Sequence, residues 1–414
     1  MVAYGWPRER YANGVISYTA EVVAGMRRIG AEPHVAVFKQ DPDARDNFVS
    51  RVPSLEMTYG PLSRTALAVC RKVCPHRTRL TLAGALLRAE IERLTGSLGA
   101  DICEIEDTNG WACPLARHSP IPVVVRLHGP WFLNGAALGV RQDRDFRRRV
   151  RDEGRGIAAA HGVTAPSRAV LEAVRSFYGL ALKDADVIPN PIAPVASNER
   201  WCLHSCEPDR ILFVGRFDRH KGGDLIIDAL AKLRSVRPGC RLTFVGPDDG
   251  VISPDGRRTH LREYVDRRLP GAFQGGVVEW LTHQPPERLA DLRRRAMITV
   301  VCSRYETFGM TAVEAMSRGC PVVAAQAGGL AEIIRDGENG LLCTPGSADD
   351  LAEKVLALLR NPDLAARLGA QAAVDAETRY CPDTIAMQTL AFYRRVIDAF
   401  ARSGRGCRQR ERDL

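Results

Sequence analysis

The sequence has no apolar run of the roughly 18 residues that a membrane-spanning helix needs. Its start, "MVAYGWPRERYANG", lacks the long apolar stretch and the small-residue cleavage site of a signal peptide. Without such a signal, its 12 cysteines are expected to be reduced thiols rather than a disulfide framework. These absences together predict a cytoplasmic protein.

Paired metal-ligand spacings are missing as well. The two cysteine clusters, at residues 70–76 and 202–206, do not have the spacing of a structural zinc site. The acidic pairs Asp248-Asp249 and Asp349-Asp350 are adjacent residues, typical of turns and helix caps rather than of a metal-binding D-x-D motif. The sequence therefore predicts no metal and no cofactor.

The net charge of +9 comes from arginines that gather at residues 64–88, 141–155 and 402–414. Because no aromatic platform or reader motif accompanies them, nucleic acid is not expected as a partner. An anionic substrate, an anionic membrane and an ordinary solvated surface all remain open. The basic helical stretch 64–94 is the candidate for membrane contact, which would place the protein peripherally at the inner membrane face.

Short apolar runs alternate with amphipathic helical patterns along the chain. Buried strands are expected at residues 34–38, 101–105, 122–129, 162–167, 210–216, 241–247, 276–282, 296–303 and 319–326. Helices are expected at 14–30, 221–235, 286–296, 311–318 and 349–360. This alternation is typical of parallel sheets buried on both faces. The pattern starts again after a linker-like stretch at 187–209, which indicates two domains.

The expected fold class is therefore α/β, with two Rossmann-like doubly wound parallel-sheet domains that face a cleft. We expect the first domain at 1–195, the second at 196–380, an amphipathic helix at 381–404 and a basic tail at 405–414. Only "MVAYGW" precedes Pro7, so either the first strand is short or the natural start lies upstream.

The stretch "SRYETFGMTAVEAMSRG" places two carboxylates, Glu306 and Glu314, around a strand-to-helix loop. In open α/β sheets ligands bind beyond the carboxyl ends of strands, where helix N-termini point. Gly309 would let the backbone approach a ligand, with free N–H groups around Phe308 and Met310. The two acids are interpreted as a ligand clamp rather than as a general acid/base pair.

A second constellation, "FVGRFDRHKGGDLIIDAL", follows the first strand of the second half. Arg216 and Lys221 come between that strand and a helix introduced by Gly222-Gly223. Two cations at the carboxyl end of a strand suit a diphosphate. The P-loop pattern G-x-x-x-x-G-K-[ST] is absent, so this is a different kind of phosphate site.

Together, "GR…KG" and the later E-x7-E in "ETFGMTAVE", followed by "AMSRGCPVVAAQAGGLAEIIRDGENGLLCTPG", resemble the family 4 retaining glycosyltransferases of the GT-B fold. The resemblance covers residues 205–360 and is thinner in the first half. It implies hexosyl transfer from a UDP- or GDP-sugar to a glycan, lipid-linked or small-molecule acceptor, without a metal. It also suggests that helix 381–404 crosses back to the first domain.

By this resemblance, Arg216 and Lys221 would hold the donor diphosphate, Glu314 the ribose and Glu306 the transferred sugar. The backbone N–H groups of Phe308, Gly309 and Met310 would contact sugar and phosphate. His128, in "VVVRLHG", would lie near the reacting face of the sugar, and Gly14 would approach the β-phosphate. Asn13 departs from the family, because it stands where a first glycine is usual.

Three other interpretations compete with this one. A phosphorylase is not supported, because the sequence has no cofactor-lysine motif. A nucleotide-sugar epimerase is not supported either, because epimerases lack the combination of motifs described above. A catalytically silent sugar-nucleotide-binding module, or an inactive partner subunit, is the alternative outside enzymes. The presence of Arg216, Lys221, Glu306 and Glu314 argues against a decayed site.

Overall fold

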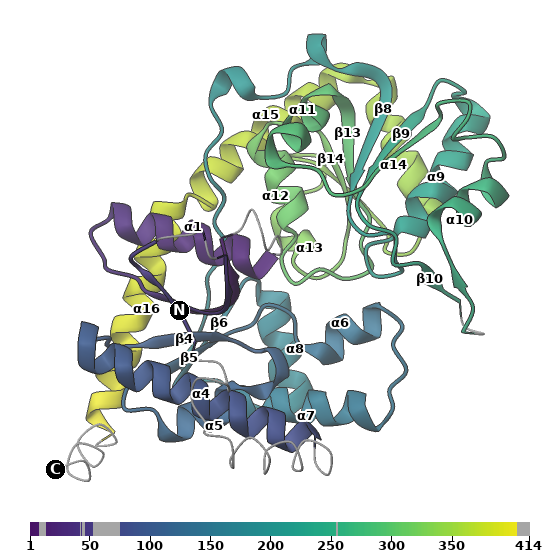
Figure 1. Ribbon diagram of the computed structural model, residues 1–414. Coiled ribbons are helices and arrows are strands. Elements are labelled where there is room, and N and C mark those ends of the chain that lie inside the picture. Colours follow the sequence, from purple (N-terminus) through teal and green to yellow (C-terminus); the bar gives the residue numbers. More distant parts are fainter. Residues whose placement is uncertain (8–13, 42, 44–45, 53–74, 254–255, 404–414) are drawn as a thin grey trace. The chain divides into compact units, whose positions relative to one another are not determined.

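The computed structural model describes residues 1–7, 14–41, 43, 46–52, 75–253 and 256–403, and the side chains of residues 75–81 and 83 are not described. The described chain forms two compact units (Figure 1). Unit 1 comprises Met1–Phe132, Gln142–Pro191 and the segment from Pro382 onward, and unit 2 comprises Leu133–Arg141 and Ile192–Cys381. The division falls at Pro191 rather than at 195, and the segment Leu133–Arg141 groups with unit 2.

Unit 2 is built on one parallel sheet of six strands in the order β12-β9-β8-β13-β14-β15. In chain order these strands are β8 (Glu207–Val214), β9 (Arg241–Val245), β12 (Val278–Leu281), β13 (Ala296–Val301), β14 (Val322–Ala325) and β15 (Leu341–Cys343). The order therefore reads 3-2-1-4-5-6, which is the doubly wound arrangement with its switch point between β8 and β13. A short hairpin of β10 (Val251–Ile252) and β11 (Arg258–Thr259) stands apart.

The helices of unit 2 are α9 (Gly223–Val236), α10 (Leu261–Arg268), α11 (Pro286–Arg295), α12 (Met310–Ser317), α13 (Leu330–Ile333), α14 (Ala348–Arg360) and α15 (Pro362–Arg379). They bury the apolar strands between them, and every residue of β13 and β14 is buried. Local signals set the helix starts: the Ser347 hydroxyl accepts a hydrogen bond from the Asp350 N–H (3.2 Å), and Pro362 follows the capping Asn361.

Unit 1 carries two parallel sheets, β1-β2-β3 and β4-β5-β6-β7. Their strands are β1 (Val2–Trp6), β2 (Val35–Gln40), β3 (Val49–Arg51), β4 (Cys103–Glu106), β5 (Val123–Arg126), β6 (Gly162–Ala165) and β7 (Ala185–Val187). The short run "MVAYGW" thus does form a strand.

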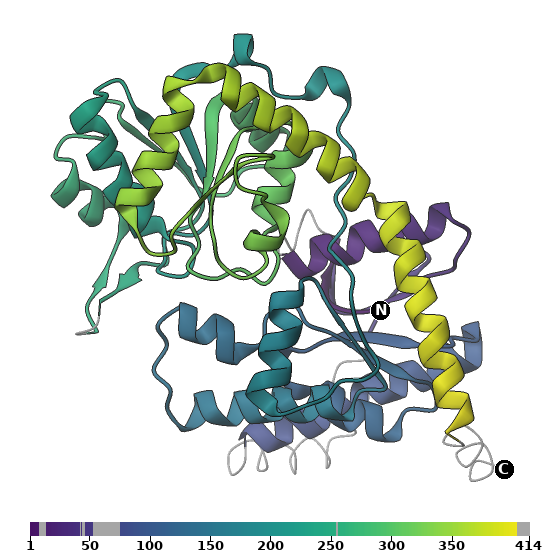
Figure 2. The ribbon, with the colours of Figure 1, turned by 180° about the vertical axis from the view of Figure 1, so that it is seen from behind.

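The helices of unit 1 are α1 (Gly14–Arg28), α4 (Pro75–Leu98), α5 (Ala112–His118), α7 (Arg144–Ala159), α8 (Arg168–Tyr178) and α16 (Pro382–Arg402), and α6 (Trp131–Ala137) begins in this unit. Helix α16 runs along α1 (Figure 2). Its apolar face packs against α1, and Ile385, Phe392 and Val396 share a core with Tyr18 and Val22. Of the described helices, none is long and apolar enough to cross a membrane.

Candidate active site

The loop that connects β13 to α12 is shaped by glycine. Gly309 caps the N-terminus of α12 with a φ of +115°, and a Cβ added there would lie 2.5 Å from Cδ2 of Leu330. Gly328 has a φ of +54°, and an added Cβ would lie 2.1 Å from the carbonyl oxygen of Glu306. A side chain at either position would displace this loop, so the loop conformation requires glycine at both positions.

Glu306 and Lys221 form a direct ion pair in the loop region. Lys221 Nζ donates to Glu306 Oε1 at 2.6 Å, and the Ser303 hydroxyl donates to the same oxygen at 2.8 Å. β8 and β13 are neighbouring parallel strands, so the two loops that carry these residues leave the sheet at the same edge. The sequence brought both residues into one site but did not predict that they contact each other.

The electrostatic balance of Glu306 favours its charged form. Burial raises the pKa of Glu306, but the Lys221 ammonium, the neighbouring His220 and the Ser303 hydrogen bond together hold the pKa below its ordinary value. A buried carboxylate that stays ionised can accept hydrogen bonds from the hydroxyl groups of a ligand.

Arg216 lies at the carboxyl end of β8, beside Lys221. Its guanidinium is 2.8 Å from Asp218 Oδ2 and 3.6 Å from Asp249 Oδ2, and its side chain is 41% exposed. Asp218 also accepts the Lys221 backbone N–H at 2.6 Å. Asp218, which stands in no recognised motif position, therefore orients the Arg216 guanidinium and the Lys221 backbone, while the partly exposed Arg216 side chain remains accessible to an anion.

Two buried polar atoms next to this pair have no hydrogen-bond partner among the described residues. His220 Nε2 lies 2.8 Å from the Tyr305 carbonyl oxygen, whereas His220 Nδ1 and the Tyr305 hydroxyl are unpartnered. Burial and then the Lys221 charge lower the pKa of His220. Unpartnered polar atoms are uncommon in protein interiors, and these two lie beside the Lys221–Glu306 pair.

Glu314 lies on α12 and forms an ion pair with Arg293 of α11. The Arg293 side chain is buried, while that of Glu314 is 34% exposed. The carboxylate is thus oriented from one side and open on the other. Nothing in the spacing of the motifs pointed to Arg293, because it comes from a preceding helix.

The remaining predicted backbone contacts lie at the start of α12. Its first residue is Met310, and the first amides of a helix have no carbonyl partner in a preceding turn, although the Ala312 N–H here donates to the Gly309 carbonyl oxygen at 2.9 Å. The Phe308 side chain is buried edge-on against Tyr380, with ring centroids 5.5 Å apart. Phe308 therefore fixes the loop in the core and leaves only its backbone for a ligand.

His128 and Gly14 belong to unit 1. The His128 ring packs edge-on against Tyr18, and its backbone N–H donates to Asp107 Oδ1 at 3.1 Å. Burial and then the Arg126 guanidinium hold the pKa of His128 well below its ordinary value, so the ring is neutral near pH 7. Gly14 opens α1, and an added Cβ there would meet nothing within 4 Å. Asn13 lies outside the described residues.

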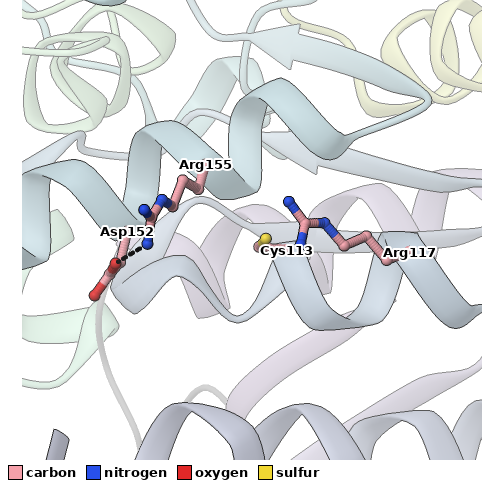
Figure 3. Close-up of a pocket in the computed structure, with 4 residues that line it drawn as sticks. All are labelled: Cys113, Arg117, Asp152 and Arg155. Carbon is pink, nitrogen blue, oxygen red and sulfur yellow. Dashed lines mark ion pairs between the residues drawn. The ribbon is translucent and has the colours of Figure 1, made fainter. Parts of the chain in front are cut away.

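A surface hollow in unit 1 is lined by Cys113, Arg117, Asp152 and Arg155 (Figure 3). The Arg155 guanidinium points toward the Asp152 carboxylate, 3.7 Å away. The hollow contains none of the predicted site residues. Among the described residues, no group of three or more His, Cys, Asp or Glu side chains gathers as metal ligands would.

Two family models match the chain. Residues 12–195 match the model described as Glycosyltransferase Family 4, and residues 203–375 match Glycosyl transferases group 1. A D-inositol 3-phosphate glycosyltransferase of Thermobifida fusca (strain YX) is 30% identical over 328 residues, which make up 75% of this chain and 71% of that protein.

Solved structures share the fold. Sucrose-phosphate synthase from Thermosynechococcus elongatus superposes with a TM-score of 0.71 at 22% identity, covering 96% of this chain and 99% of that one. Anabaena HepE, solved with UDP and glucose, superposes with a TM-score of 0.62 at 20% identity, covering 94% and 97%. The family and the fold class predicted from the sequence are confirmed. The chain belongs to the family 4 glycosyltransferases of the GT-B fold and is a hexosyltransferase.

Proposed function

We propose that this chain is a retaining hexosyltransferase that uses a UDP- or GDP-sugar as donor, needs no metal, and transfers to a glycan, lipid-linked or small-molecule acceptor. The observation that carries the proposal is the Lys221–Glu306 ion pair beside Arg216, at the edge of the sheet where α9 and α12 begin. This arrangement offers cations, helix amides and an ionised carboxylate to one ligand.

Arg216 and Lys221 bind the donor diphosphate. The Arg216 guanidinium supplies a planar fork for phosphate oxygens, and the Lys221 ammonium supplies a point charge. The first amides of α12 add hydrogen-bond donors with the positive end of the helix dipole behind them. These groups stabilise the negative charge that develops on the departing nucleoside diphosphate.

The two glutamates divide the rest of the donor between them. Glu306 accepts hydrogen bonds from hydroxyl groups of the transferred sugar, since its charge is kept by Lys221 and Ser303. Glu314 accepts those of the ribose through the exposed side of a carboxylate that Arg293 orients. The clamp therefore separates recognition of the sugar from recognition of the nucleotide.

His128 acts on the transferred sugar as a neutral imidazole, because burial and Arg126 lower its pKa. A neutral ring accepts or donates one hydrogen bond without adding charge beside an oxocarbenium-like centre. Gly14 lets the loop before α1 approach the β-phosphate. Retention by front-face attack rests on the family resemblance, not on a protein nucleophile.

The acceptor binds in unit 1. The Thermobifida relative carries the name of a D-inositol 3-phosphate enzyme, which supports a polyhydroxylated and phosphorylated acceptor without excluding a lipid-linked one. Of the predicted membrane-contact stretch 64–94, residues 64–74 lie outside the described residues, and residues 75–94 belong to α4.

A basic helix face supports peripheral contact with an anionic membrane at the cytoplasmic side. On α7 the arginines recur at helical spacing on the side opposite the buried Phe146 and Val150: the exposed Arg144, Arg147, Arg151 and Arg155 and the half-exposed Arg148. Headgroup charge attracts such a face, and salt weakens the attraction. Co-sedimentation with phosphatidylglycerol vesicles that disappears at high salt is expected, and no pelleting at low salt would contradict it.

The test of the donor site is a screen of UDP-glucose, UDP-N-acetylglucosamine, GDP-mannose and GDP-glucose by thermal shift, followed by slow donor hydrolysis. We expect one donor to raise the melting temperature and to release its free sugar, with Lys221→Met losing both effects. If a donor stabilises the chain, but none of the four is hydrolysed and no sugar is transferred to any offered acceptor, the chain is a binding module instead.

A further inference from the structure

Arg304 joins the two loops of the candidate site. Its Nη1 and Nη2 donate to the two carboxylate oxygens of Asp224 at 2.8 and 2.7 Å, and Nη1 also donates to the Arg219 carbonyl oxygen at 2.7 Å. Its backbone N–H donates to the His220 carbonyl oxygen at 2.9 Å. One residue of the loop after β13 therefore makes four hydrogen bonds to the segment between β8 and the first turn of α9.

These bonds bracket the Lys221–Glu306 pair. Asp224 lies three positions after Lys221, and Arg304 lies two positions before Glu306. A bidentate guanidinium–carboxylate pair fixes orientation as well as distance. The side chains of Arg304 and Asp224 are only 21% and 14% exposed, so water screens this pair less than an ordinary surface pair.

We propose that Arg304 is a positioning residue for the transfer reaction, an inference that rests on the proposed function. Through Asp224 it holds Lys221 and Glu306 in the geometry that the donor requires before the donor arrives. All the bonds of its guanidinium described above go to Asp224 and Arg219, so it acts on the donor through Lys221 and Glu306.

Arg304 has a second effect, on charge. Asp224 is the acidic residue of the first turn of α9, next to the cations assigned to the diphosphate. Paired with Arg304, it adds little repulsion toward phosphate. Removing Arg304 alone leaves this carboxylate uncompensated, whereas removing both charges leaves only the loss of the connection. The two effects can therefore be separated by substitution.

The experiment measures KM and kcat for the best donor of the four-donor panel in four variants of the full chain: Arg304→Gln, Arg304→Lys, Asp224→Asn and the double Arg304→Gln/Asp224→Asn. We expect kcat to fall between about 10- and 100-fold in the double variant, because small misplacements of catalytic groups cost this much. Arg304→Gln alone should raise the donor KM further, and Arg304→Lys should recover the KM but not the kcat.

The matched control is Arg288→Gln, which removes a surface pair with Asp291 (2.8 Å) on α11 and should leave both constants unchanged. Circular dichroism separates loss of folding from loss of geometry. If Arg304→Gln does not fold, the Arg304→Lys and Asp224→Asn variants decide by the same split between KM and kcat.

Arg304 variants with the constants of the control would overturn the positioning role. Lys221→Met, measured in parallel, tests the proposed function itself. A Lys221→Met variant with wild-type constants would contradict that function. An inactive Lys221→Met variant beside fully active Arg304 variants would contradict only the positioning role.

Discussion

Lys221→Met is expected to destabilise unit 2 even without a donor. The substitution removes the ammonium 2.6 Å from Glu306 and leaves the carboxylate on a side chain that is only 11% exposed. Removing one partner of a buried ion pair costs about 3–5 kcal/mol. Because the Lys221 side chain itself is 28% exposed, water screens part of this interaction and the low end, about 3 kcal/mol, is expected.

The expected change is measurable by calorimetry on the full chain. For a domain of this size, 3 kcal/mol corresponds to a fall in Tm of about 6–12 °C. The double variant Lys221→Met/Glu306→Gln should recover most of the loss, because no buried charge remains unpaired. Lys232→Met is the matched control: its pair with Asp349 has the same 2.6 Å separation but lies at the surface, so its removal should cost about 0–1 kcal/mol.

The pH dependence follows from the same pair. The pKa of Glu306 is lowered in the folded chain, so its contribution to stability is present above the unfolded pKa of about 4.3 and is lost as pH falls through the lower, folded pKa. In Lys221→Met the ammonium that lowers the pKa of Glu306 most is gone, so burial raises the pKa of Glu306 instead. That variant should therefore gain stability relative to wild type as pH falls toward 4.

Equal Tm losses for Lys221→Met and Lys232→Met, or additive losses in the double variant Lys221→Met/Glu306→Gln, would refute the reasoning about the buried ion pair.

Three further predictions concern the donor site. Glu314→Ala should weaken nucleoside diphosphate binding by about 10-fold or more, through loss of hydrogen bonds to a charged group. Glu306→Gln should instead change the affinity for the nucleoside diphosphate only a few-fold and lower kcat. Isothermal titration measures the affinities and steady-state kinetics the kcat values. His128→Ala should lower kcat by about 100-fold with donor affinity unchanged, and equal losses of both would exclude its role at the sugar. Gly328→Ala should abolish donor binding and lower Tm, since its Cβ would lie 2.1 Å from the Glu306 carbonyl oxygen; Gly337→Ala, which shares a positive φ but has open space around it, controls for the strain alone.

The elements that the sequence predicted well are those with long or fully buried patterns. β8, β9, β13 and β14 follow apolar runs, and α9, α11, α12 and α14 follow helical spacing within one or two residues. β3, β7 and β15 were not predicted because each is three residues long and largely half-exposed, too short for a pattern of burial to show.

The site was predicted at the level of residues but not of contacts. Glu306, Glu314, Arg216 and Lys221 stand in motifs with recognisable spacing. Their partners Asp218 and Arg293 were not predicted, and neither was the pair of Arg304 with Asp224, because each of these contacts is set by the path of a loop or by a neighbouring helix rather than by spacing within a motif. Contacts between distant segments, such as that of Lys221 with Glu306, which lie 85 residues apart, appear only once the sheet order places β8 beside β13.

The most direct test of the account is a crystal structure of the chain with the nucleoside diphosphate sugar that the donor screen selects. The account predicts the diphosphate on Arg216, Lys221 and the first amides of α12, the ribose hydroxyls on Glu314, and the sugar hydroxyls on Glu306. A diphosphate bound away from Arg216 and Lys221, or a ribose that does not contact Glu314, would contradict it.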